Sequence, residues 1–121
     1  MPDIARFGVR FDEEAFLEDL AHATVSGRTI ARQARERFER DGVTAAAVKP
    51  CLAEGPDGTQ LPGCVKVYLP PPGGPWGMVL RLRRERDELV LYQLAFGLRH
   101  PSRPWQPSVY QVAHRRLHGA R

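Results

Sequence analysis

Apolar and cationic residues alternate most densely between residues 76 and 100, and this pattern predicts two paired strands. One face of the first strand would carry Met78, Leu80 and Leu82, and the other Val79, Arg81 and Arg83. The polar run 85–88 is short enough to reverse the chain into 89–96, which is apolar on nearly every position, as a central strand would be. We therefore expect a hairpin with one core face and one basic face.

Two further stretches show the same period of two. Residues 4–11 place Phe7, Val9 and Phe11 on one side and arginines on the other, which predicts a half-buried strand. In residues 64–69 the inward positions are Val65, Val67 and Leu69, and the outward positions are Cys64, Lys66 and Tyr68. The proline-rich run 70–75 cannot continue a strand, so it is expected to turn the chain toward residue 76.

Helical spacing predicts three helices. Asp12 is suited to cap a helix over 13–23, and Ser26 a second one that ends at Asp41 and Gly42. A short helical extension is expected within 43–48, limited by Pro50. After a proline-punctuated connection over 101–107, Ser108 is expected to cap a last helix that Gly119 ends. The buried stripe of this helix would be Val109, Val112, Ala113 and Leu117.

These elements define an α+β class in β-α-α-β-β-β order with a C-terminal helix. The expected architecture is a small, mostly antiparallel sheet. All of its helices, including the two N-terminal ones, are expected to pack on one face of this sheet. The 121 residues, 42% of them hydrophobic, fit a single domain over 1–121.

Charge is distributed unevenly along the chain. Residues 1–63 hold 8 basic and 11 acidic side chains, whereas residues 64–121 hold 10 basic and 3 acidic ones, within a net charge of +4. A basic half attracts polyanions, so RNA, DNA or an acidic protein are the first candidate partners, against the alternative of a merely solvated basic surface. Two cysteines, no signal-peptide pattern and no long apolar run favour a reduced cytoplasmic location without a membrane span.

Several motifs together resemble the RelE/ParE toxin superfamily, and its HigB/RelE-like branch in particular. The opening F-G-V-R-F-D-E-E-A-F-L-E-D-L is similar to the family's first strand and helix. Three stretches look like its strand meander, and a fourth like its tail: L-P-G-C-V-K-V-Y, W-G-M-V-L-R-L-R-R, E-L-V-L-Y-Q-L-A-F-G-L-R-H and S-V-Y-Q-V-A-H-R-R-L. The insert 101–107 departs from the family pattern, and its lysine-rich strand is reduced here to Lys66.

The resemblance implies a bacterial type II toxin, a ribosome-dependent endoribonuclease that cleaves messenger RNA. Its partners would be the ribosome, the messenger and a cognate antitoxin, with which it would form a hetero-oligomer. It would need neither a cofactor nor a metal. The cysteine and histidine positions are also not at zinc-ligand spacings.

Metal-independent RNA cleavage needs a proton acceptor, positive charge on the phosphate and a proton donor for the leaving oxygen. Arg81 and Arg83 project from one strand and are assigned to the phosphate, with the alternative that they only keep an exposed face soluble. Lys66 and Tyr68 project from the neighbouring strand and would bind the nucleic acid.

The acid or base is left open among several residues. Arg99 and His100 end the apolar strand, and His100 would titrate near neutral pH. Tyr110 and His114 share a face of the last helix and would meet the arginines if that helix folds back across the sheet edge. In this set Arg99, His100, Tyr110 and His114 are candidate catalytic residues, and Arg115 and Arg116 candidate nucleic-acid contacts.

Two tryptophans flank the candidate site. Trp76 and Trp105 are suited to stack on unpaired bases, although core packing is expected for Trp76. Two further function classes stay open beside the nuclease. One is a non-catalytic member of the same fold, such as a ParE-like gyrase inhibitor that acts through its first two helices. The other is a module that binds nucleic acid or protein, with steep salt dependence if the ligand is nucleic acid.

Overall fold

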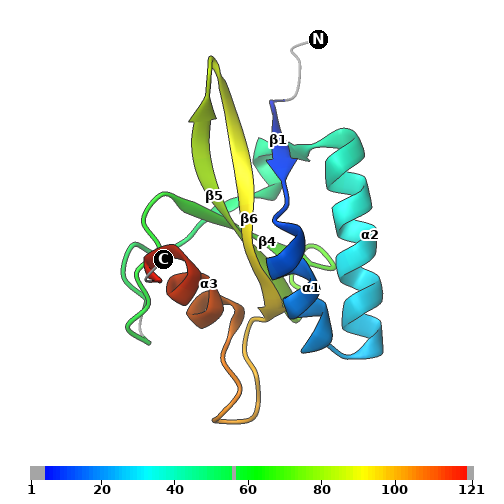
Figure 1. Ribbon diagram of the computed structural model, residues 1–121, viewed down its shortest axis with the longest axis vertical. Coiled ribbons are helices and arrows are strands. Elements are labelled where there is room, and N and C mark those ends of the chain that lie inside the picture. Colours follow the sequence, from blue (N-terminus) through cyan, green and yellow to red (C-terminus); the bar gives the residue numbers. More distant parts are fainter. Residues whose placement is uncertain (1–4, 56, 120–121) are drawn as a thin grey trace.

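The computed structural model describes residues 5–55 and 57–119. Its strands are β1 (Arg6–Arg10), β2 (Val43–Thr44), β3 (Lys49–Pro50), β4 (Cys64–Leu69), β5 (Trp76–Glu85) and β6 (Glu88–Leu98). Its helices are α1 (Glu13–Ala21), α2 (Val25–Asp41), the 3-10 turn η1 (Ala45–Ala47) and α3 (Val109–His118). The α+β class and the order of the main elements are confirmed (Figure 1).

One six-stranded sheet in the order β2-β1-β6-β5-β4-β3 organises these elements. The β4-β5-β6 meander is antiparallel, as the alternation predicts, and β1 joins it in parallel beside β6. Because β1 pairs only with positions 90–92 of β6, the rest of that strand edge is free to meet helices. The predicted first strand starts at Arg6, and Ile4 lies outside the described residues.

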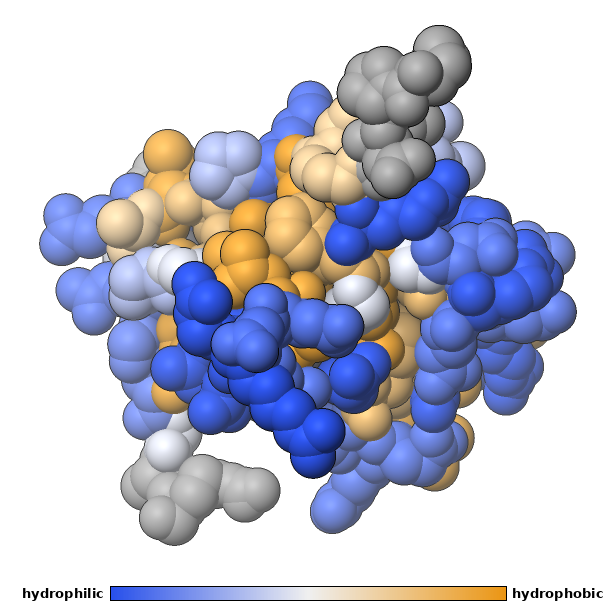
Figure 2. Space-filling view, turned by 90° about the horizontal axis from the view of Figure 1, so that it is seen from above, coloured by the Kyte–Doolittle hydropathy of each residue, from blue (hydrophilic) through white to orange (hydrophobic). Residues whose placement is uncertain are grey.

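The β5–β6 hairpin turns at Arg86, whose positive φ of 57° suits a tight reversal. Its distal half projects beyond the helices at the upper end of Figure 1. Leu82, which the alternation places on the core face, is therefore 38% exposed, and Leu89 is 42% exposed. Figure 2, which looks down on this end, shows apolar side chains bordered by hydrophilic ones.

Helices α1 and α2 cover one face of the sheet, as predicted. The Asp12 carboxylate accepts from the N–H of Ala15 at 3.1 Å, and α1 ends at Ala21, two residues before the predicted end. Thr24 caps α2 instead of Ser26, because its hydroxyl accepts from the N–H of Gly27 at 3.1 Å. The core of this face is formed by Phe16, Leu20, Ala31, Ala34, Phe38, Met78, Leu80 and Leu91, among others.

Helix α3 packs on the opposite face, so the prediction of all helices on one face is wrong. Its Val109 and Ala113 contact a second core that includes Val79 and Ala95. The physical reason is in the strands, because β5 is buried at every position from Trp76 to Leu80 and thus needs cover on both sides. Cys64, predicted to point outward, is buried in this second core.

Between α2 and β4 the chain runs along both edges of the sheet. Within 43–48, where a short helical extension is expected, residues 45–47 form the 3-10 helix η1, but Val43 and Thr44 form strand β2, which pairs with β1. Strand β3 then pairs with β4 in the register Lys49 with Lys66. Within the part of the chain that the structure describes, no helix is both long and apolar enough to cross a membrane.

Candidate functional site

Cationic and aromatic side chains gather on the α3 face of the sheet, beside the start of that helix. Alternation along β4 directs Lys66 and Tyr68 to this face, and the β3–β4 register sets Lys49 opposite Lys66. Arg99 follows the end of β6, and Tyr110 comes from the first turn of α3. We call these residues, Lys49, Lys66, Tyr68, Arg99 and Tyr110, the Tyr68 cluster.

The ring of Tyr68 is the centre of the cluster. The guanidinium carbon of Arg99 lies 3.6 Å from the ring centroid, and the Nζ atoms of Lys49 and Lys66 lie 4.8 and 5.6 Å from it. The Nζ of Lys66 is also 5.3 Å from the ring centroid of Tyr110. One lysine therefore connects the two phenols, and three cations surround one of them.

Arg99 is fixed in place by the backbone and by a glycine. Its Nη1 donates to the carbonyl of Gly74 at 2.9 Å, and its Nε is buried without a hydrogen-bond partner among the described residues. A Cβ on Gly77 would lie 2.9 Å from Cγ of Arg99, so this position leaves room for the arginine stem. The buried Nε is therefore one donor of this guanidinium whose hydrogen bond is not satisfied among the described residues.

The cations change the titration of Tyr68. Burial acts to raise the pKa of Tyr68, but the positive charges of Lys66, Arg99 and Lys49 outweigh it, and the pKa falls below its ordinary value of 10. The phenolate of Tyr68 therefore forms at a lower pH than that of a free tyrosine. A phenol that releases its proton more readily, next to cations, has the chemistry of a proton acceptor at a phosphate site.

The predicted site residues divide into groups. Lys66, Tyr68, Arg99 and Tyr110 come together as described. Arg81 pairs with Cys64 in the β4–β5 register, and Arg83 lies 5.4 Å from the ring of Tyr92 on the projecting half of the hairpin. Both arginines are exposed on the α3 face of the sheet, but further along β5 than the cluster. His100 is exposed in the bend after β6.

The α3 candidates other than Tyr110 have different surroundings. The Nδ1 of His114 accepts from the N–H of Gln60 at 2.9 Å, and its ring lies 4.7 Å from that of His118. Arg115 is exposed. Arg116 is committed to a buried ion pair with Asp19, so it is not free to bind a nucleic acid.

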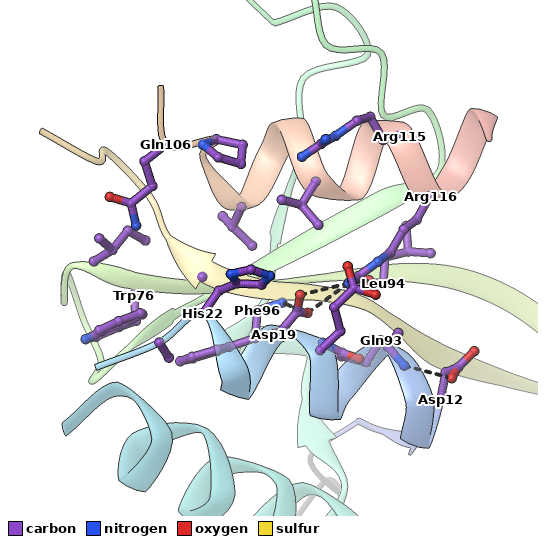
Figure 3. Close-up of a pocket in the computed structure, with 18 of the residues that line it drawn as sticks. Asp12, Asp19, His22, Trp76, Gln93, Leu94, Phe96, Gln106, Arg115 and Arg116 are labelled. Atoms are coloured by element: carbon purple, nitrogen blue, oxygen red, sulfur yellow. Dashed lines mark hydrogen bonds and ion pairs between the residues drawn. The ribbon is translucent and has the colours of Figure 1, made fainter. Parts of the chain in front are cut away.

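This ion pair lies in a groove of about 990 Å³ between α1 and α3. The part of the β6 edge that is not paired with β1 lines this groove. Figure 3 shows Asp19 and Arg116 meeting there from opposite walls. Asp19 accepts from the N–H of Phe96 at 2.9 Å, and Arg116 donates to the carbonyl of Leu94 at 2.8 Å. The two side chains thus take the place of a neighbouring strand.

Sequence reasoning missed Lys49, Gly77 and the Asp19–Arg116 pair. Lys49 lies in a strand of two residues, and only the β3–β4 register brings it to Tyr68. Asp19 and Arg116 are 97 positions apart, and no local pattern links them. Among the described residues, no group of three histidine, cysteine or carboxylate side chains is arranged to hold a metal ion.

No protein-family model, curated protein or solved structure shows a significant match to the chain.

Proposed function

We propose that the protein is an endoribonuclease toxin of the RelE/ParE type that cleaves messenger RNA on the ribosome without a metal. The observation that carries this proposal is the Tyr68 ring with three cations within 3.6–5.6 Å of its centroid. The motif resemblance and the strand-helix-helix-meander order support it. The partners proposed with it are the ribosome, the messenger and an antitoxin, and the proposed location is the cytoplasm.

The cleavage is an in-line displacement at one phosphate. The phenolate of Tyr68 takes the proton of the 2′-hydroxyl, the 2′-oxygen bonds to phosphorus, and the bond from phosphorus to the 5′-oxygen breaks. The products are a 2′,3′-cyclic phosphate and a 5′-hydroxyl. Tyr68 is assigned as the base because its pKa is lowered by the cations around it.

The other cluster residues serve the phosphate and the leaving group. Arg99 and Lys66 carry positive charge to the phosphorane oxygens, where the developing charge is largest, and Lys49 adds to it. Tyr110 donates the proton to the leaving 5′-oxygen, since it shares Lys66 with Tyr68. His100 is the alternative acid, as it follows Arg99 directly.

Arg81 and Arg83 are assigned to phosphates that flank the scissile one. They continue the basic face along β5, beyond Lys66, and both are exposed. Contacts of this kind raise affinity without selecting a base, so their loss should weaken binding and reduce its salt dependence.

The test is induction of the chain in a bacterial host, with messenger 5′ ends mapped genome-wide. We expect growth arrest and new ends at defined codon positions, and both should disappear in Tyr68→Phe and Arg99→Ala. Arg32→Ala, on an exposed position of α2, is the control that should remain toxic. Arrest without new ends would contradict the nuclease and favour a gyrase inhibitor, which changes on α1 and α2 would then weaken.

A further inference from the structure

The loop between β6 and α3 carries a solvent-exposed tryptophan. Trp105 is 76% exposed, the highest value among the large hydrophobic residues described. Trp76, by contrast, is 7% exposed and stacks on Phe96 with 5.2 Å between ring centroids and 6° between planes. Trp76 is therefore core, as expected, whereas the indole of Trp105 contributes little to the packing of the fold.

Both ends of this loop are anchored at the Tyr68 cluster. Arg99 stands at its start, and Tyr110 follows its end within the first turn of α3. In Figure 1 the loop projects from the lower end of the molecule. Trp105 is six residues from Arg99, so the chain limits their separation to about 20 Å. That is a span of a few nucleotides of single-stranded RNA.

The loop is stiff enough to present the ring. Prolines occupy three of the seven positions 101–107, and each holds φ near −65°. The N–H of Gln106 donates to the carbonyl of Arg103 at 3.1 Å, which closes a turn around the tryptophan. A ring held in this way loses little conformational entropy when a partner stacks on it.

The charges around Trp105 favour a polyanion. The guanidinium carbon of Arg103 lies 5.7 Å from its ring centroid, and the sequence from 99 to 107 contains no carboxylate. On one side Trp105 borders the α1–α3 groove, whose lining holds four carboxylates, from Asp12, Glu14, Glu18 and Asp19, against the three arginines Arg103, Arg115 and Arg116. On the other it lines a shallower hollow with Arg115, His114 and a single carboxylate, Asp57. The phosphates of a bound strand are therefore expected on the second side.

We propose that Trp105 is a stacking subsite for one unpaired base of single-stranded RNA, a few nucleotides from the phosphate held by Arg99, with Arg103 and Arg115 at the adjacent phosphates. The role of this subsite in cleavage rests on the proposed function, whereas its binding of RNA does not. Aromatic stacking is tolerant of base identity, so the subsite raises affinity and selects unpaired over paired RNA.

The binding test uses a 2′-O-methylated 12-nucleotide single strand, which cannot be cleaved because its 2′-oxygens are blocked. Titration should change the tryptophan fluorescence of the wild-type protein but not that of Trp105→Leu. Trp105→Leu should weaken binding by about 5- to 150-fold, the range for loss of one stacked base. Trp105→Phe should retain most of the affinity, and Val25→Ala, at a position 72% exposed on α2, should retain all of it.

An abasic scan of the same strand identifies the stacked base. At one position, removal of the base should reduce wild-type affinity to the level of Trp105→Leu and should have no further effect in that variant. Equal affinity of wild type and Trp105→Leu, or an abasic effect that persists in full in the variant, would overturn the subsite. The RNA subsite would also be overturned if Trp105→Leu binds RNA normally but no longer binds a partner protein.

Cleavage kinetics separate this proposal from the proposed function. If wild type cleaves, Trp105→Leu should raise KM and leave kcat unchanged, and an unchanged KM would overturn the subsite alone. If wild type does not cleave but shows Trp105-dependent binding, the nuclease is wrong and the subsite stands.

Discussion

Removing the Asp19 carboxylate should destabilise the fold more than any surface change of the same size. The side chain is 6% exposed and makes two hydrogen bonds to Arg116, at 2.8 and 2.9 Å, besides the one to the N–H of Phe96. Burial acts to lower the pKa of Arg116, but Asp19 and then Glu18 outweigh it and raise the pKa. The pair therefore joins α1 to β6 and α3.

Asp19→Ala removes the Asp19 carboxylate from Arg116, whose guanidinium keeps the carbonyl of Leu94 and Glu18, and it leaves the N–H of Phe96 without its acceptor. Breaking one side of a buried ion pair costs about 3–5 kcal/mol. With an unfolding entropy of about 2.1 cal/mol/K per residue over 121 residues, this loss lowers Tm by about 12–20 °C. Asp19→Asn keeps an acceptor for the N–H of Phe96 and should cost less.

Thermal unfolding followed by circular dichroism measures the effect. The double variant Asp19→Ala with Arg116→Met should be less destabilised than the sum of the single variants, since each single variant already loses the Asp19–Arg116 contact. The exposed Arg40–Asp41 pair is the control, and Arg40→Ala should not shift Tm measurably. A decrease in Tm of less than about 4 °C for Asp19→Ala, or strict additivity in the double variant, would refute the reasoning.

Other positions give separate expectations. Gly27→Ala should cost about 1–3 kcal/mol in chemical denaturation, because its Cβ would overlap the Trp76 indole, whereas Gly73→Ala has open space and should be neutral. Phenolate absorbance should show that Tyr68 titrates below its ordinary pKa of 10, and Lys66→Met should raise that pKa again. Because the pKa of Tyr68 is lower in the folded state than in the unfolded state, its ionisation stabilises the fold. This stabilisation is fully present only above the unfolded-state pKa, and it is lost as the pH falls through the folded-state pKa. Burial, helped by Cys64, raises the pKa of Cys51 to about 11, so iodoacetamide should modify it much more slowly at pH 8 than it modifies a free cysteine.

Local patterns account for most of the elements. Period-two alternation found the meander, and the capping residues Asp12 and Ser108 found the starts of their helices. Side-chain alternation does not reveal which face of the sheet a later helix will cover, and so the predicted position of α3 was wrong. The signal was present in the apolar run of β6, which is typical of a strand buried on both faces.

The candidate site was predictable only in part. Lys66, Tyr68, Arg99 and Tyr110 were all named from the sequence, because each lies at the end of an element or on the outer face of one. Their grouping depends on strand register and on the path of α3, which are set by contacts between distant residues. Arg81 lies on the expected strand face, but it pairs with Cys64, whereas Lys66 of the cluster pairs with Val79, two positions nearer the start of β5.

The most direct test of the central claim is cleavage of a defined messenger by the purified protein on translating ribosomes, with the chemistry of the new ends determined. We predict cuts in the messenger that leave a 2′,3′-cyclic phosphate and a 5′-hydroxyl. These cuts should be lost in Tyr68→Phe and Arg99→Ala and kept in Arg32→Ala. An intact messenger with the wild-type protein, or cleavage that survives both cluster substitutions, would contradict it.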